Sequence, residues 1–201
     1  MKKVVLSCIL LLAICMQVSA QGYSVGSVVG DFRLKNVDGK MVSLADFKSA
    51  KGFIVVFTCN TCPVAKVYES RIVALNEEYA SKGYPVIAIN TNDPVASPGD
   101  SFVKMQERAK EKNFKFPYLE DADQQLTKKF GAAHTPTVYI VSKTSKGNVV
   151  EYTGAIDNDQ DDSNASKTTF VKNAVDELMS GKKPSVSKTK AVGCTVKWKK
   201  A

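Results

Sequence analysis

Two short apolar runs, at residues 52–58 and 84–90, stand out in the hydrophobic pattern of the chain. Their length and their content of Val and Ile are typical of strands buried on both faces of a sheet. Between them, apolar positions recur at helical spacing over residues 64–80, and Gly83 follows as a helix-ending residue. The order strand, helix, strand predicts a βαβ unit whose two strands run parallel.

The rest of the pattern adds strands and helices to this unit. Alternating apolar positions on both sides of Asp38-Gly39 predict a hairpin over residues 31–44. Further along, the pattern predicts helices over 97–112, 123–130 and 168–179, an extended piece over 116–119, and an antiparallel pair of strands over 135–141 and 149–152. The polar segment 157–166 is expected to be a solvated loop. Together these elements predict an α/β domain with a mixed central sheet flanked by helices.

The beginning of the chain has the pattern of an export signal. Lys2 and Lys3 precede an apolar run over residues 4–18, which is too short for a membrane span of about 20 residues and stops before Ala20. A buried N-terminal helix is the alternative. We expect a cleaved signal peptide, a folded domain and a lysine-rich tail, over residues 1–20, 21–181 and 182–201. The protein is then periplasmic or secreted, with no stable membrane insertion after cleavage.

The formal net charge of +8 is partly concentrated in the tail, which has seven lysines and no acidic residue. These lysines are dispersed among Val, Gly and Trp, so we interpret them as solvated surface. Contact with an anionic partner is the alternative. Export argues against a nucleic-acid partner.

Of the five cysteines, two lie in the predicted signal peptide, which leaves Cys59, Cys62 and Cys194. A close pair with a distant third favours redox chemistry over a disulfide framework, which has even counts and larger spans. The pair falls between the first predicted strand and its helix, where unpaired N–H groups and the helix dipole stabilise a thiolate. We expect Cys59 to be the nucleophile and Cys62 to be the resolving thiol.

Two other interpretations of the Cys-x-x-Cys motif are weaker. Tetrahedral zinc needs two more ligands, and the chain beyond the signal peptide offers only His134 and Cys194 as further nitrogen or sulfur ligands. A structural disulfide at a strand-to-helix turn does little to join distant parts of a chain. We therefore expect neither a metal nor another cofactor.

Thr135-Pro136 is the second chemical element, because a proline there opens a strand expected to lie next to the cysteines. A cis bond would turn the Thr135 backbone toward the sulfurs, where it can hydrogen-bond an extended substrate. A trans proline at a strand start is equally compatible with the residues alone. His134, beside this dipeptide, is either a titrating neighbour of the thiolate or a surface residue.

Several segments resemble the thioredoxin-like redoxins, the group that includes alkyl hydroperoxide reductases and thiol-specific antioxidant proteins. The matching segments are Gly30-Asp31-Phe32, Phe57-Thr58-Cys59-Asn60-Thr61-Cys62-Pro63, Ile89-Asn90-Thr91-Asn92-Asp93, Phe116-Pro117-Tyr118-Leu119, Gly131-Ala132-Ala133-His134-Thr135-Pro136 and Tyr152-Thr153-Gly154-Ala155-Ile156-Asp157. The ending Gly193-Cys194-Thr195-Val196-Lys197-Trp198 is similar to that of a subgroup with a Cys-Asn-x-Cys-Pro site. The resemblance implies a thioredoxin-like fold with an N-terminal hairpin extension, a cis Pro136 and an accessible Cys59.

The chain also departs from this pattern. Phe53 stands where thioredoxins usually carry a buried acid, so proton transfer at the cysteines must use another group or water. The proline and threonine that precede a peroxidatic cysteine are replaced, relative to Cys62, by Val55 and Cys59. This makes peroxidase activity the second hypothesis.

The leading hypothesis is an exported thiol–disulfide oxidoreductase that works through Cys59 and Cys62, with Thr135 and Pro136 in support. Its partners would be protein or small-molecule disulfides and a membrane-linked thiol reductant. The alternatives are a peroxiredoxin-like thiol peroxidase and a non-catalytic binding protein. Cys194 is either a third redox thiol, if the tail folds back onto the pair, or a buried free cysteine. Asp93 either approaches the cysteines or forms a turn.

Overall fold

The structure, a computed structural model, describes residues 22–200, so the predicted signal peptide lies outside the described residues. In chain order its elements are β1 (Val28–Val29), β2 (Arg33–Asn36), β3 (Met41–Ser43), β4 (Gly52–Thr58), α1 (Pro63–Tyr79), β5 (Val86–Asn90), α2 (Phe102–Glu111), β6 (Tyr118–Glu120), α3 (Gln125–Phe130), β7 (His134–Thr135), β8 (Thr137–Thr144), β9 (Gly147–Gly154), α4 (Phe170–Met179) and β10 (Cys194–Thr195). Among these helices, none is long and apolar enough to cross a membrane.

Eight strands form one mixed sheet in the order β1-β9-β8-β4-β5-β6-β2-β3. Strand β4 pairs parallel with β5, and β8 pairs antiparallel with both β4 and β9. The predicted βαβ unit is therefore confirmed as β4-α1-β5. The predicted hairpin is also present as β2 and β3, and β2 extends the sheet by pairing with β6.

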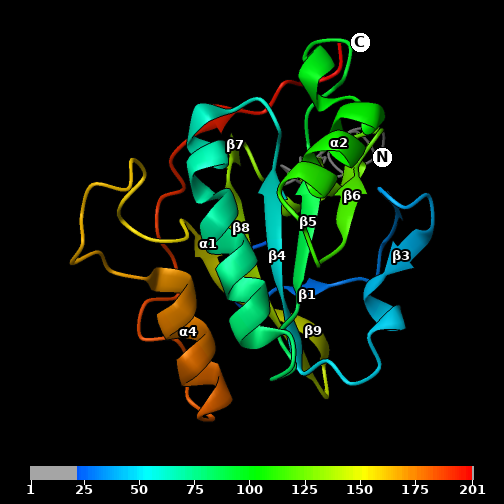
Figure 1. Ribbon diagram of the computed structural model, residues 1–201. Helices are drawn as coiled ribbons and strands as arrows, with labels where there is room; N and C mark the ends of the chain where they lie inside the picture. Colours follow the sequence, from blue (N-terminus) through cyan, green and yellow to red (C-terminus); the bar gives the residue numbers. More distant parts are fainter. Residues whose placement is uncertain (1–21, 201) are drawn as a thin grey trace, which may run out of the picture.

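Alternate residues of β4 enter two separate apolar cores, because successive side chains of a strand point to opposite faces. Ile54 and Val56 pack on the face covered by α1, α2 and α4, whereas Phe53, Val55 and Phe57 pack on the face with α3. Figure 1 shows α1 and α4 side by side in front of the sheet. Burial on both faces explains why this strand is continuously apolar. The architecture is thioredoxin-like, as the resemblance implied.

Two predicted elements are split in the structure. The helix expected over 97–112 begins as a 3-10 turn, Pro98–Asp100, and Ser101 then adopts an extended backbone before α2 starts. The strand expected over 135–141 is divided at Pro136 into β7 and β8. A proline has no N–H for a ladder bond, which accounts for the second break.

The acidic segment after β9 is a loop, but its central carboxylates are buried. Arg71 of α1 forms ion pairs with Asp157, Asp159 and Asp162, and the first contact is 2.8 Å long. Asp157 and Asp159 are 4% and 2% exposed. The expectation of a solvated loop is therefore wrong for these two side chains, because a guanidinium from α1 compensates their charge.

The tail is docked on the domain. After α4 it runs beside β9, where the Thr189 N–H donates to the Thr153 carbonyl. It then passes the start of α1, as the red segment of Figure 1 shows, and contributes β10, which pairs antiparallel with β7. The seven lysines of the tail are exposed, which confirms their interpretation as solvated surface. The tail backbone over residues 188–197 nevertheless contacts the domain.

Candidate active site

The redox turn, residues 59–62, joins the end of β4 to the start of α1. Cys62 is the N-cap of α1, and Pro63 occupies the first helical position, where a missing N–H costs nothing. The Cys62 sulfur accepts a hydrogen bond from the Ala65 N–H at 3.5 Å. The predicted position of the pair at a helix N-terminus is confirmed, with Cys62 as the capping residue.

Thr135 contacts both sulfurs of the pair. Its hydroxyl oxygen lies 3.2 Å from the Cys59 sulfur, and its carbonyl oxygen lies 3.3 Å from the Cys62 sulfur. The Thr135-Pro136 bond is cis, as the resemblance implied. The structure therefore brings together four residues that the sequence analysis singled out: Cys59, Cys62, Thr135 and Pro136.

The tail places a third cysteine at this site. Cys194 pairs with Thr135 across β10 and β7, and its backbone N–H donates to the Cys62 sulfur at 3.4 Å. The Cys194 side chain packs in one small cluster with Cys59 and Cys62. Of the two arrangements left open by the sequence, the structure has the one in which the tail folds back onto the pair.

The cysteine pair is buried beneath this cover. Cys59 is 3% exposed and Cys62 is 2% exposed, whereas Cys194 is partly exposed. The expectation of an accessible Cys59 is therefore wrong for this conformation. The physical reason is that the tail pairs with β7 at Thr135 and packs against the two cysteines.

Hydrogen bonding shifts the pKa values of the two cysteines in opposite directions. The thiol of Cys59, then the hydrogen-bond donors of Cys194 and Ala65, lower the pKa of Cys62 to about 4 against the opposing effect of burial. The pKa of Cys59 is raised by its hydrogen bond to Cys62, by burial and by the charge of Asp100. Two backbone N–H groups, those of Ala65 and Cys194, reach the Cys62 sulfur. This geometry favours the thiolate at Cys62, whereas the sequence analysis expected it at Cys59.

A buried carboxylate behind the redox turn was missed by the sequence analysis. Asp100 is 2% exposed and accepts hydrogen bonds from the Asn60 N–H at 2.5 Å and the Thr61 hydroxyl at 2.7 Å. Three more donors reach it from the side chains of Ser97, Asn92 and Asn90. Because it lies in a segment with helix-start composition, the sequence offered no signal of this role.

The neighbouring positions singled out from the sequence have structural roles. The Asp93 carboxylate accepts the Ala96 N–H at 3.1 Å, which is the turn-forming alternative, and the Asp93 N–H donates to the Lys197 carbonyl. His134 lies in β7, where it pairs with Thr195 of the tail. Across residues 22–200, no group of three or more His, Cys, Asp or Glu side chains is placed to hold a metal ion.

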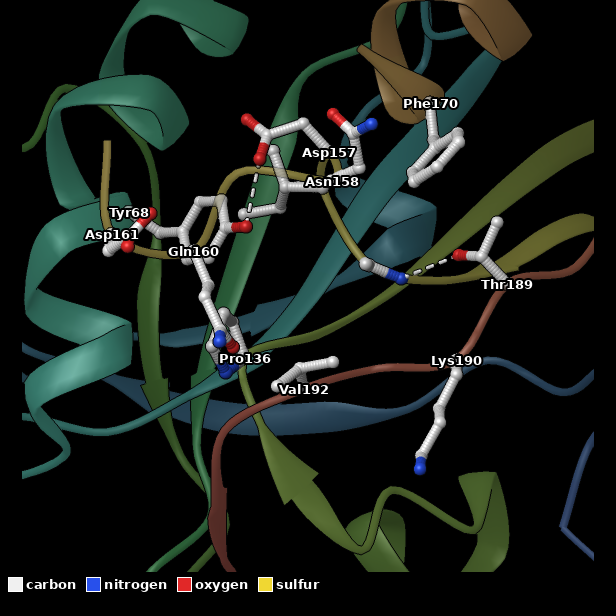
Figure 2. Close-up of a pocket in the computed structure, with 12 residues that line it drawn as sticks. Tyr68, Pro136, Asp157, Asn158, Gln160, Asp161, Phe170, Thr189, Lys190 and Val192 are labelled. Carbon is white, nitrogen blue, oxygen red and sulfur yellow. Dashed lines mark hydrogen bonds between the residues drawn. The ribbon is translucent and has the colours of Figure 1, made fainter. Parts of the chain in front are cut away.

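A cavity of about 450 Å³ lies beside Pro136. Figure 2 shows its walls: Tyr68 from α1, Phe170 at the start of α4, the loop after β9, and the tail at Val192. Tyr68 donates a hydrogen bond to Asp157 at 2.8 Å, which fixes one wall of the cavity to the acidic loop. The cis proline and Val192 of the tail thus line a hollow that does not include the cysteine pair.

Comparison with known proteins gives relatives with redox names. The chain is 26% identical over 151 residues to the thiol-disulfide oxidoreductase ResA of Bacillus thuringiensis, covering 69% of this chain and 81% of that protein. It is also 26% identical over 126 residues to ResA of Bacillus subtilis, covering 63% and 66% of the two chains.

Solved structures extend the likeness to nearly the whole chain. A hypothetical protein of Sinorhizobium meliloti is 28% identical with a TM-score of 0.82, covering 90% of this chain and 98% of that one. An uncharacterized conserved protein of Geobacillus kaustophilus is 33% identical with a TM-score of 0.82, covering 89% and 94%. A putative DsbE of Chlorobium tepidum, at 20% identity and a TM-score of 0.54 over 66% of this chain and 85% of that one, shares the fold.

The family assignment rests on a match that spans most of the sheet and the redox turn. The model of the AhpC/TSA family matches residues 25–152, which include both Cys59 and Cys62 and the cis Pro136. These residues are also the part of the chain that forms the main sheet. The chain therefore belongs to the AhpC/TSA family.

Proposed function

We propose that this protein is a thiol–disulfide oxidoreductase that uses the dithiol of Cys59 and Cys62. The observation that carries the proposal is the contact of two sulfurs at a helix N-cap, one with its pKa lowered to about 4, both against Thr135. A lowered pKa matters because the thiolate is the species that attacks a disulfide. Family membership and the ResA relatives support the same class of activity.

The backbone N–H groups of Ala65 and Cys194 both donate to the Cys62 sulfur, and we assign the attacking role to Cys62 on this geometry. Its thiolate attacks one sulfur of a substrate disulfide, forms a mixed disulfide, and releases the other substrate sulfur, which takes up a proton. Cys59 then loses its proton, attacks the Cys62 sulfur and releases the second substrate thiol. The substrate gains two electrons, and the enzyme is left with a Cys59–Cys62 disulfide. This order exchanges the roles that the sequence analysis gave to the two cysteines.

Thr135 and Pro136 are the proposed support for an extended substrate. Strand β7 offers its backbone edge beside both sulfurs, and β10 now pairs with that edge. A substrate segment that pairs there must displace the tail. The cavity beside Pro136, with Phe170 and Val192 in its walls, would accept an apolar side chain of the substrate. Protein or small-molecule disulfides are therefore the proposed substrates.

The site of action is proposed to be outside the cytoplasm, in the periplasm or secreted. The supporting observation is the basic start, short apolar run and small-residue end of residues 1–20. Each exchange oxidises the Cys59/Cys62 dithiol to a disulfide, which must be reduced before the next one. Outside the cytoplasm, a membrane-linked thiol reductant would supply the electrons. The Cys-Asn-x-Cys-Pro site together with the tail would define a subgroup of the family.

Insulin reduction by dithiothreitol, compared with hydrogen peroxide consumption, tests the proposal. We expect the wild-type protein to accelerate insulin reduction, and Cys62→Ser and Cys59→Ser to reduce the rate to background. Thr144→Ser, an exposed change at the end of β8, is the matched control and should retain the wild-type rate. Peroxide consumption faster than insulin reduction would instead favour a thiol peroxidase, and activity in both serine variants would favour a non-catalytic role for the pair.

A further inference from the structure

We propose that Cys194 is a third catalytic thiol, which forms a disulfide with Cys62 and passes electrons from an external dithiol to the buried pair. This inference rests on the proposed exchange at Cys59 and Cys62 and adds the route by which that pair is reduced again. It differs from the alternative in which Cys194 is only a small apolar residue under the tail.

The first support is the position of Cys194 relative to the reacting sulfur. Its backbone N–H reaches the Cys62 sulfur at 3.4 Å, and its side chain packs against the cluster that contains that sulfur. Strand β10 pairs antiparallel with β7 so that Cys194 stands opposite Thr135. Cys194 therefore occupies the place in which an extended substrate would present its own cysteine to Cys62.

The second support is that contacts on both sides of Cys194 hold it there. At position 193 a side chain would overlap the Thr135 carbonyl, so only glycine permits this approach. On the other side, Val196 is 4% exposed and its N–H donates to the Ala133 carbonyl. The Lys197 backbone is held by the side chains of Asn92 and Gln124. The cysteine is thus fixed in register, and a shift of one residue along β7 would turn it away from Cys62.

The third support is exposure. Cys59 and Cys62 are almost fully buried, whereas Cys194 is partly exposed at the surface of the same cluster. Among the cysteines of residues 22–200, it is the one that a reductant can reach while the tail is docked. A membrane-linked dithiol therefore has access to the pair through Cys194 without moving the tail.

The relay consists of two exchanges that balance. In the oxidised enzyme, the Cys194 thiol loses its proton and attacks the Cys62 sulfur; the Cys59–Cys62 bond breaks, and Cys59 takes up a proton. The external dithiol then attacks the Cys194 sulfur, and Cys62 leaves as a thiolate. The second thiol of the reductant resolves its mixed disulfide with Cys194. The low pKa of Cys62 makes it a good leaving group in the second exchange.

Trapping the proposed bond is the first part of the test. The full chain carrying Cys59→Ser is oxidised with oxidised glutathione, and its disulfides are mapped by mass spectrometry. We expect an intramolecular Cys62–Cys194 bond. The double variant Cys59→Ser, Cys194→Ser should instead keep glutathione on Cys62. Glutathione retained on Cys62 in the single variant, with Cys194 free, would overturn the proposal.

Kinetics separate a relay from a bond with no function. Oxidised wild type and Cys194→Ser are mixed with dithiothreitol, and reduction is followed by the fluorescence of Trp198, the single tryptophan of the chain. We expect Cys194→Ser to slow reduction by about tenfold or more, because an intramolecular step is lost. Thr195→Ser is the matched control and should react as wild type does.

An equal rate in wild type and Cys194→Ser would overturn the relay while leaving the Cys59 and Cys62 chemistry intact. Insulin reduction distinguishes the two failures. If the reduced form of Cys194→Ser still transfers its electrons to insulin in a single turnover, a slow reduction step is specific to the relay. If reduced wild type transfers none, the proposed function itself fails. Cys194→Ala repeats the comparison without a hydroxyl in the cluster.

Discussion

Two regions hold the redox turn, one through a buried side-chain carboxylate and the other through backbone hydrogen bonds. Behind it, the loop at Pro98–Asp100 offers one buried carboxylate that accepts five hydrogen bonds, two of them from Asn60 and Thr61 of the turn. In front of it, the tail uses mainly backbone hydrogen bonds, to Ala133, Asp93 and the Cys62 sulfur. The first region is buried, and the second has an exposed outer side.

This difference indicates which side can open. Releasing Asp100 would leave a buried charge and its donors unpaired, which costs several kcal/mol. Releasing the tail returns backbone groups to water and exposes few apolar side chains, namely Val196, the buried part of Trp198 and the cysteine pair beneath them. Segments with few buried apolar contacts open at low free energy. We therefore infer that the turn keeps its geometry while the tail departs for a substrate.

The largest effect is expected from Asp100→Asn. The amide keeps the size of the side chain but turns an N–H group toward donors that now bond a carboxylate oxygen. We expect the free energy of unfolding to fall by about 2–4 kcal/mol, measured by urea denaturation. Asp123→Asn is the control at an exposed position and should cost less than about 0.5 kcal/mol. Equal losses in both variants would show that the loop does not hold the turn.

A smaller effect is expected from Gly193→Ala, which keeps all three sulfurs but places a methyl group against the Thr135 carbonyl. The tail should then open more often, and alkylation of the cysteine pair at neutral pH should accelerate by about tenfold, the equivalent of about 1.4 kcal/mol. Gly39→Ala is the control, since Gly39 also has a positive φ, of 83°, but has open space around it. If both variants alkylate at the wild-type rate, the tail is not the cover of the site.

The sequence predicts the parts of this site that depend on local periodicity. Strand β4 has the predicted bounds, and α1 begins one residue before the predicted start because Pro63 is its first residue. Tyr68, Ile72 and Tyr79 are buried, as their spacing indicates. A strand buried on both faces and an amphipathic helix each carry their own signal, and together they fix where Cys59 and Cys62 fall.

The parts that depend on distant pairing have no such signal. Strand β10 is two residues long and exists because it pairs with β7, about sixty residues earlier in the chain. The pKa shifts of the two cysteines come first from the hydrogen bond between them, and then in part from the Cys194 donors and from Asp100, which approach from separate segments. Proximity to a helix N-terminus predicts that one sulfur ionises; it does not tell which one.

The smallest effect is expected on the ionisation of Cys62. Its measurement distinguishes the contribution of the tail to the Cys62 pKa from the contribution of the redox turn. The thiol of Cys59 is the largest cause of the lowered pKa of Cys62, and the donors of Cys194 are lesser causes. Cys59→Ala should therefore raise this pKa from about 4 by more than Gly193→Ala does. An ultraviolet titration of the thiolate, with Cys62→Ser as the blank, measures both shifts.

The sign of the accompanying stability change follows from the same pKa. Because the pKa of Cys62 is about 4 in the folded protein and 9.0 for an ordinary thiol, the unfolded chain binds the extra proton between these values. Stabilisation by the thiolate is thus complete above pH 9.0 and is lost as the pH falls toward 4. Cys62→Ser should flatten this slope, and Gly193→Ala should leave most of it. A slope abolished by Gly193→Ala would mean that the tail, and not the redox turn, holds the charge on Cys62.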